Sequence, residues 1–304
     1  MTEKKYELRK QIKSVRWMVF WVVLAQFAAE LVVGAVFSFM EDPPHEYIRI
    51  AIVELLAIGV PIVVYARSAW NSGIDKAKQE FWLNPCKPYC LLLAALIGIL
   101  GQFVMILLNI PANFLIQTVI KQTYEDAIPM ALNGREVFLG IVAVVIIPAV
   151  LEEFWMRGII FSAYNKSNTL AAIFLTSLLF ALLHLKINEA LGFLFMGIVA
   201  SVVLVKCNSI YGAMVYHGFS NLTALLIDIF VLPYIEKNYI WPVFTLAVLG
   251  FVAVVTLLLM QKNKMTVHRN FKAGPLVLNT VFSMPIILSV VVVIAKYFLI
   301  NVIG

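Results

Sequence analysis

The chain has 304 residues, of which 62% are hydrophobic and only 13% are charged, and its mean hydropathy is +0.94. This balance excludes a soluble globular domain and predicts an all-α, polytopic transmembrane helix bundle. The formal net charge of +6 could favour nucleic acid, but the basic residues lie in short segments between apolar runs, which is typical of membrane proteins. We therefore expect the lipid bilayer as a partner and no nucleic acid.

The chain begins with a basic segment and a long apolar helix. Residues 1–16 contain six Lys or Arg residues, and an apolar run follows from about Trp17 to Met40. This run is too long for the core of a signal peptide and lacks a small-residue cleavage site, so we expect a retained first membrane helix. Glu30 interrupts the run and is expected to face the interior of the bundle.

A second membrane helix is predicted over about Tyr47–Tyr65, with Glu54 inside it. One face of residues 66–87 is apolar and carries Trp70, Ile74, Ala77 and Phe81. This pattern predicts a short helix lying in the membrane interface. The third apolar run, from Pro88 to about Ile120, is too long for one straight span, and Pro111 is expected to kink it or divide it.

Six further apolar runs complete the chain. They cover approximately residues 136–164, 169–185, 187–206, 209–232, 240–260 and 275–302. The total is about eight or nine membrane helices, and nine if every run crosses the bilayer. In the first of these six runs Pro148 has no N–H for the carbonyl of Val144, so this carbonyl needs a neighbouring helix or water as its partner.

The distribution of basic residues predicts the orientation of the chain. With nine spans and the N-terminus inside, 17 of the 23 Lys and Arg residues fall on the cytoplasmic side. This asymmetry favours a cytoplasmic N-terminus, and the short loops favour the plasma membrane. We divide the chain into N-terminal membrane helices with the interfacial segment (1–135), a helical core (136–232) and C-terminal membrane helices (233–304).

The helical core contains the sequence LEEFWMRG at residues 151–158. An ionisable group at the centre of a membrane helix costs roughly 2.5–3.5 kcal/mol, so three within six residues need a reason. Residues four apart share a helix face, so Glu153 and Arg157 can pair, whereas Glu152 is turned away by about 100°. The spacing therefore leaves Glu152 available for general-base chemistry.

Two of the four histidines lie within apolar runs. Phe180 and His184 share one helix face, as do His217 and Asn221, because each pair is four residues apart. A single intramembrane histidine is more often a hydrogen-bonded packing residue. Polar groups on three neighbouring helices, together with Glu152, instead favour a shared hydrated pocket.

Three motifs follow one another in this order: Glu152-Glu153-x-x-x-Arg157, Phe180-x-x-x-His184 and His217-x-x-x-Asn221. They resemble the motifs of the CAAX protease and bacteriocin-processing (CPBP) family, also called the Abi or CAAX amino-terminal protease family, over approximately residues 138–230. The resemblance implies an intramembrane endopeptidase, related to the Ras-converting CAAX protease, that acts on a membrane-associated protein or peptide, prenylated or not.

By this resemblance, Glu152 and His184 activate the attacking water, and His217 and Asn221 stabilise the oxyanion. Glu153, Arg157 and Phe180 support the geometry of the site. The chemistry of these residue types agrees, because a Glu with a His can polarise water, a step worth on the order of 10²–10⁴ in rate. A donor to the oxyanion is typically worth roughly 2.7–4 kcal/mol.

A zinc mechanism is the alternative at the same site. Glu152, His184 and His217 are a plausible ligand set, with water in the fourth position. Asn is a poor zinc ligand, however, and no His-x-x-x-His or His-Glu-x-x-His spacing places ligands on one helix. We favour a glutamate protease without a cofactor over a zinc-dependent metalloprotease.

Two functions from other classes fit the same residues. One is a non-catalytic membrane protein that gives immunity to a peptide toxin or acts as a scaffold. The other is a proton-coupled transporter with Glu152 and His184 as a proton relay, although the chain has no internal repeat of the kind common in transporters. No pattern in the sequence identifies the substrate.

Overall fold

The computed structural model describes residues 3–41, 44–71, 73–120, 133–184, 186–231, 237–262 and 267–303. Within these ranges every regular element is a helix, as predicted, and the pairing of Asn168 with Arg269 is an isolated bridge. By length and composition, seven described helices can cross a membrane, or eight if the bent pair at 273–281 and 284–296 is one span. The chain is therefore a multi-pass helical membrane protein.

The described helices are α1 (Glu3–Ser38), α2 (Glu46–Glu54), α3 (Val60–Asn71), α4 (Ile74–Glu80), α5 (Pro88–Ile120), α6 (Gly134–Gly140), α7 (Ile147–Glu153), α8 (Ser162–Asn165), α9 (Thr169–Leu183), α10 (Ala190–Cys207), α11 (Ile210–Leu226), α12 (Lys237–Leu259), α13 (Ala273–Val281) and α14 (Met284–Ile303). Four π-helical segments interrupt them: η1 (Leu55–Gly59), η2 (Ile141–Ile146), η3 (Phe154–Phe161) and η4 (Ile227–Val231). The predicted second and fourth membrane helices are thus built from α-helical and π-helical pieces, over Glu46–Arg67 and Gly134–Asn165.

The predicted total of nine spans is too high because α9 is short. It has 15 residues, whereas about 20 apolar residues are needed to cross the hydrocarbon core. The helix ends at Leu183, so His184 caps its C-terminus. The prediction that His184 lies inside a membrane helix is therefore wrong by one residue, and this imidazole stands where the chain leaves the helix.

The third predicted run forms one helix. α5 continues through Pro111 to Ile120, so Pro111 does not divide it. Two residues earlier, the side-chain Oδ1 of Asn109 accepts a hydrogen bond of 2.8 Å from the backbone N–H of Gly192. This contact joins α5 to the start of α10.

Residues 66–87 do not form a single interfacial helix. Gly73, with φ of +119°, separates α3 from α4, and a positive φ of this kind favours glycine. Ala77 and Phe81 are fully buried, whereas Trp70 and Ile74 are exposed, so only part of the predicted face packs inward. The Phe81 ring lies edge-on to Phe154 with centroids 5.7 Å apart, which anchors this segment on the helix that carries the acidic motif.

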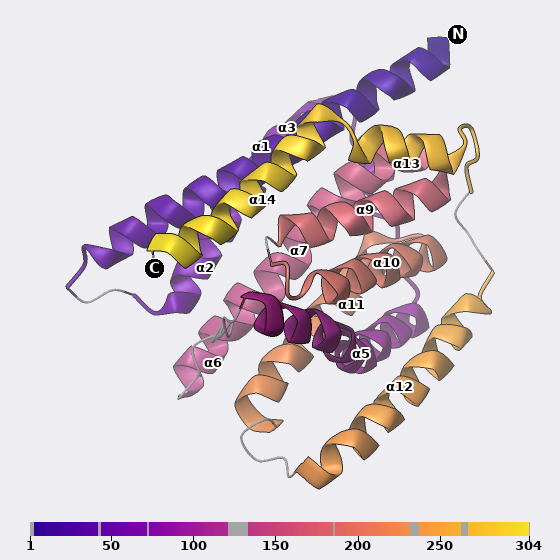
Figure 1. The fold of residues 1–304 in the computed structure, drawn as a ribbon. Coiled ribbons are helices and arrows are strands. Elements are labelled where there is room, and N and C mark those ends of the chain that lie inside the picture. The colour runs from indigo at the N-terminus through magenta and orange to yellow at the C-terminus, as the bar shows by residue number, and fades with distance from the viewer. Residues whose placement is uncertain are drawn as a thin grey trace.

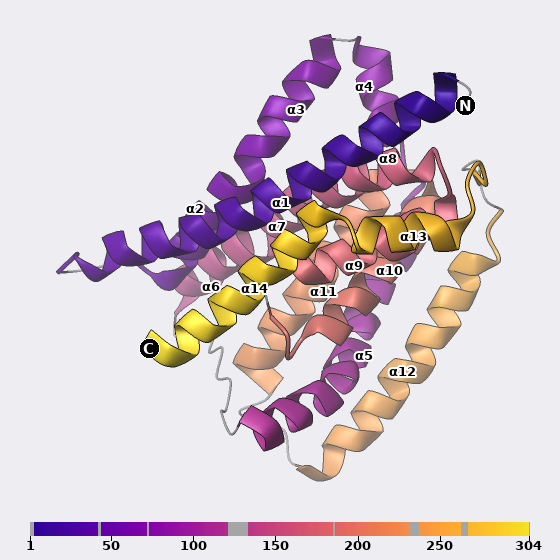
Figure 2. The ribbon, with the colours of Figure 1, turned by 45° about the horizontal axis from the view of Figure 1, so that its top comes forward.

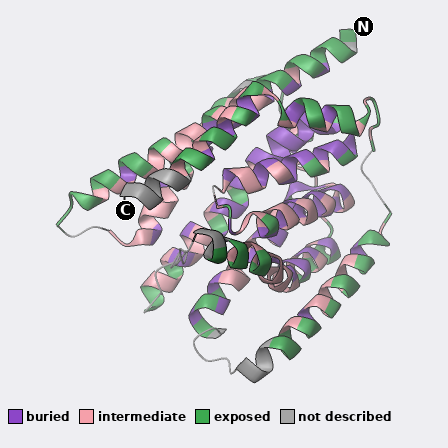
Figure 3. Cartoon of the chain, in the orientation of Figure 1, coloured by how far each residue is buried: buried purple, intermediate pink, exposed green. Residues whose placement is uncertain are grey.

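The helices form a central group with flanking layers. α5, α9, α10 and α11 pack against one another, and α7 packs against α11 while the following segment η3 packs against α9. α1 and α14 lie side by side on one flank of this group and α12 lies on the other (Figures 1 and 2). Buried residues are concentrated in the central group, while α12 is largely exposed or intermediate (Figure 3). Large apolar side chains such as Val64 and Leu246 are exposed on the outer helices, as expected where lipid is the solvent.

The central helices approach each other closely at glycines. A Cβ added at Gly98 of α5 would lie 2.4 Å from the carbonyl oxygen of Tyr216 and 3.0 Å from the backbone N of Ser220. Small residues allow membrane helices to pack backbone against backbone in this way. The contact holds α11, which carries His217 and Asn221, tightly against α5.

Candidate active site

The acidic motif lies in the interior of the bundle, where α7 gives way to η3. Glu152 is 7% exposed, and Glu153 and Arg157 have no exposed surface. Arg157 lies in the π-helical segment η3, and π-helical turns inside α-helices are frequent at functional sites. The chain therefore buries three ionisable groups within two turns of helix.

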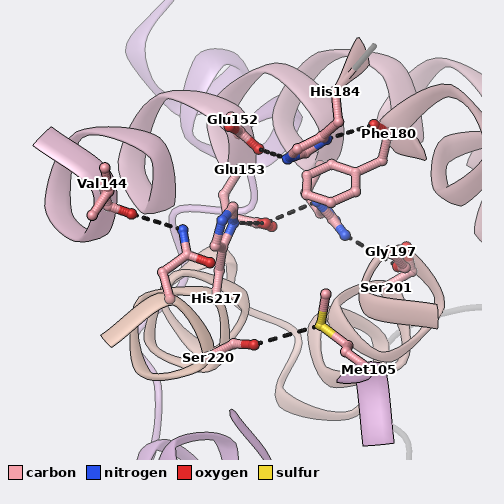
Figure 4. A network of polar contacts seen from close by, with 12 residues as sticks. Met105, Val144, Glu152, Glu153, Phe180, His184, Gly197, Ser201, His217 and Ser220 are labelled. Carbon is pink, nitrogen blue, oxygen red and sulfur yellow. Dashed lines mark hydrogen bonds and ion pairs between the residues drawn. The ribbon is translucent and has the colours of Figure 1, made fainter. Parts of the chain in front are cut away.

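Glu153 is the centre of an ionic network. Its Oε1 accepts a hydrogen bond from Nη1 of Arg157 and another from Nδ1 of His217, each 2.8 Å long (Figure 4). The predicted pair of Glu153 with Arg157 is confirmed, and the bond from His217 was not predicted. Because Nδ1 of His217 donates to a carboxylate, this nitrogen carries a proton. Glu153 thus orients His217 from a neighbouring helix.

Arg157 ties the motif to two more helices. Its Nη2 donates a 3.1 Å hydrogen bond to the carbonyl of Gly197 on α10. Its guanidinium lies 5.1 Å from the centroid of the Phe180 ring on α9, within the range of a cation–π contact. The buried charge of Arg157 is therefore met by a carboxylate, a carbonyl and an aromatic face.

Phe180 lies between the two histidines. Its ring centroid is 4.5 Å from that of His184 and 5.8 Å from that of His217, edge-on in the second case. The ring of Phe193 on α10 stacks on His184 with centroids 3.7 Å apart. The three aromatic contacts restrict both imidazoles to one orientation.

His184 and Glu152 face each other without a direct hydrogen bond. Nδ1 of His184 donates to the carbonyl of Phe180 over 2.9 Å, so in the neutral ring Nε2 carries the lone pair. Nε2 lies 3.7 Å from Oε2 of Glu152, which is too far for a hydrogen bond, and this buried oxygen has no hydrogen-bond partner. Two facing acceptors at this distance fit a molecule with two O–H donors, such as water.

Asn221 reaches the helix that precedes the acidic motif. Its Nδ2 donates a 2.9 Å hydrogen bond to the carbonyl of Val144 (Figure 4), the acceptor that Pro148 cannot serve. The expectation that a neighbouring helix supplies this partner is confirmed. A carboxamide has two N–H donors, so the second remains for another acceptor.

The hydroxyl of Ser220 is directed elsewhere. It donates to Oε1 of Gln102 over 3.0 Å and lies 3.8 Å from Sδ of Met105, both on α5. The serine thus serves the contact between α11 and α5.

Residues 134–223 match the family model described as Type II CAAX prenyl endopeptidase Rce1-like. This part of the chain is similar to the CAAX protease family. The match spans all three motifs, from Glu152 to Asn221, as the resemblance implied. Searches of curated proteins and of solved structures found no match to the chain. The family supports an intramembrane endopeptidase of the CAAX type.

Among the residues that the structure describes, no three His, Cys, Asp or Glu side chains are grouped so that they could hold a metal ion. Nδ1 of His184 and Nδ1 of His217 are engaged with Phe180 and Glu153, which leaves Nε2 of each ring for a further contact.

Two residues near the CAAX protease motifs were missed by the sequence analysis. Phe193 gave no signal, because an aromatic residue in an apolar helix is most simply a packing residue. Glu54 of α2 did give one, since an ionisable residue in a membrane helix is a candidate for function by default. Its carboxyl group lies near that of Glu152.

Proposed function

We propose that the chain is an integral-membrane endopeptidase that hydrolyses a peptide bond of a membrane-associated protein or peptide by a metal-free, glutamate-type mechanism. The observation that carries the proposal is the facing of Glu152 and His184 across 3.7 Å, inside a core matched to the CAAX protease family. A water molecule that donates to both acceptors has its oxygen lone pair free for a carbonyl carbon.

In the first step, the water oxygen attacks the scissile carbonyl while a proton passes to Glu152 or His184. The C–N bond then breaks, and the same group returns the proton to the leaving amine. The water supplies one hydrogen to each product, so the reaction needs no co-reactant.

The developing oxyanion needs hydrogen-bond donors. The second N–H of Asn221 and the Nε2–H of a protonated His217 can supply two, and one such donor is worth roughly 2.7–4 kcal/mol. Glu153 accepts from Nδ1 of His217 and so turns the Nε2 edge of the ring away from itself; this is the edge that can donate to the oxyanion when both ring nitrogens carry a proton. Glu153 and Arg157 therefore act by orienting His217.

The orientation follows from the positive-inside rule. We propose that the N-terminus is cytoplasmic and that the protein lies in the plasma membrane, since residues 1–16, which precede the first membrane helix, carry six Lys or Arg residues.

The test uses purified protein in liposomes with membrane-anchored peptides, prenylated and unprenylated, as substrates. Glu152→Gln keeps the size of the side chain but removes the base, and cleavage should fall by at least on the order of 10²-fold. The matched control is Glu30→Gln, another intramembrane carboxyl, which pairs with Lys296 at 2.7 Å and should leave cleavage intact. Wild-type cleavage by Glu152→Gln would instead support a non-catalytic role or a transporter.

A further inference from the structure

The imidazole of His184 stands at the end of α9, and its side chain is 19% exposed. Within α9 it is held by the hydrogen bond from Nδ1 to the carbonyl of Phe180. A second contact comes from another helix, since the ring of Phe193 on α10 stacks on the imidazole with centroids 3.7 Å apart and planes 23° from parallel. Aromatic pairs usually have centroids roughly 4.5–7 Å apart, so this is a close face-to-face contact.

The stack restricts rotation of the imidazole about its Cβ–Cγ bond. To exchange its two edges, the ring of His184 would pass through an orientation perpendicular to Phe193, and its edge would then collide with that ring. The exchange would also break the hydrogen bond to Phe180 and turn Nε2 away from Oε2 of Glu152, from which it lies 3.7 Å. The stack therefore keeps Nε2 on the side of the ring that faces Glu152.

The position of Phe193 is fixed in turn by Asn109 of α5, a helix outside the matched residues 134–223. The first N–H groups of a helix have no partner within it, and Glu189, at the N-cap of α10, gives them no side-chain hydrogen bond. Oδ1 of Asn109 instead accepts the 2.8 Å bond from the N–H of Gly192, the residue before Phe193. A Cβ at Gly192 would lie 2.7 Å from Nδ2 of Asn109, so this close approach needs a glycine.

We infer that Asn109 and Phe193 are positioning residues for the hydrolysis: Asn109 fixes the start of α10, and Phe193 thereby holds the imidazole of His184 toward Glu152. The inference rests on the proposed function. Phe180 completes the enclosure, because its ring lies edge-on to Phe193 with centroids 6.4 Å apart. Asn109 and Phe193 thus act through His184 and lie outside the three motifs.

The first experiment compares Phe193→Leu, Phe193→Tyr and the control Phe195→Leu in the liposome assay. Leucine is apolar but has no flat face, so kcat should fall on the order of 10- to 100-fold through misplacement of His184, with KM little changed. Tyrosine keeps the flat ring and should retain most of kcat. Phe195 lies on the same helix but pairs with Phe251 of α12, with centroids 5.4 Å apart, so its leucine variant should keep the wild-type kcat.

A wild-type kcat in Phe193→Leu would overturn the inference. So would equal losses in Phe193→Leu and Phe195→Leu, because the effect would then be one of helix packing. A Phe193→Tyr protein as slow as Phe193→Leu would also overturn it, since a flat ring would then be insufficient.

The second experiment tests the link through Asn109 from both sides of its hydrogen bond. Asn109→Leu removes the acceptor, and Gly192→Ala places a methyl group against it. Each should lower kcat with KM little changed. The double variant of Asn109→Leu with Phe193→Leu should be no slower than Phe193→Leu alone, because residues that act through one contact are not additive. Additive losses would overturn the positioning role of Asn109.

The third experiment needs no substrate. NMR of protein labelled with ¹³C at histidine Cε1 detects the four imidazoles, and His184→Gln assigns the signal of interest. The ring current of Phe193 should displace the His184 proton signal upfield in wild type and in Phe195→Leu. The displacement should be lost in Phe193→Leu and reduced in Asn109→Leu.

An undisplaced signal in wild type, or an unchanged one in Phe193→Leu, overturns the stack, and an unchanged signal in Asn109→Leu overturns the link to α5. If no cleavage is found in wild type, the proposed function fails while this result still decides the contact.

Discussion

The side-chain amide of Asn221 donates a 2.9 Å hydrogen bond to the carbonyl of Val144, which Pro148 leaves without its helical partner. A residue proposed to bind the oxyanion thus also supplies the hydrogen bond that Pro148 cannot donate within the helix that carries Glu152. The bond crosses from α11 to η2 and sets the distance between the two halves of the site. Its structural and chemical roles can be separated by substitution.

Asn221→Ala should lower kcat by roughly 10²–10³-fold through loss of an oxyanion donor and stability by about 1–3 kcal/mol through the unpaired carbonyl. In the double variant with Pro148→Ala, the new N–H can bond to Val144. Stability should therefore recover while activity does not. The measurements are kcat and the thermal unfolding midpoint in detergent, with Pro148→Ala alone as the control. Recovery of activity in the double variant would show that Asn221 acts only on structure.

Local spacing was enough to predict the pair of Glu153 with Arg157 and the need for a partner at Val144. Both follow from the helix period and from the missing N–H of proline, which depend on a single helix. The apolar runs likewise predicted the helices, because a membrane helix must be long and apolar.

Contacts between helices could not be predicted in the same way. The hydrogen bond from His217 to Glu153 depends on how each of the two helices is rotated about its axis. No period in one run encodes that rotation. The predicted end of the run over residues 169–185 was two residues late, because the apolar Leu185 follows His184 although α9 itself ends at Leu183.

Arg157 should be required for folding. Arg157→Ala leaves the fully buried Glu153 with only His217 as a partner, and breaking a buried pair costs about 3–5 kcal/mol. We expect little folded protein, measured as the monodisperse fraction in size-exclusion chromatography. The double variant Glu153→Gln with Arg157→Leu removes both charges and should regain folded protein without activity. A stable Arg157→Ala protein would show that the pair contributes little.

The contact of α5 with α11 at Gly98 should tolerate no side chain. A methyl group there meets backbone atoms of Tyr216 and Ser220, which cannot move aside as a flexible side chain could. Overpacking of this kind costs typically about 1–3 kcal/mol, so Gly98→Ala should lower the unfolding midpoint and displace His217. The control is Gly34→Ala on α1, where a Cβ meets nothing within 4 Å. It should be neutral or stabilising by up to about 1 kcal/mol, and equal effects of the two would contradict the packing argument.

Removal of metal ions should leave cleavage unchanged. Among the described residues, no trio of His, Cys, Asp or Glu side chains is grouped so that it could hold a metal ion. The purified protein should contain far less than one zinc per chain by elemental analysis, and its rate should survive chelation. A zinc protease treated in parallel shows that the chelator works. The prediction is contradicted if the protein binds one zinc tightly and loses its activity on chelation until zinc is restored. Glu152, His184 and His217 would then have to move together to bind the ion. The 3.7 Å separation of Glu152 from His184 would describe the protein without its metal.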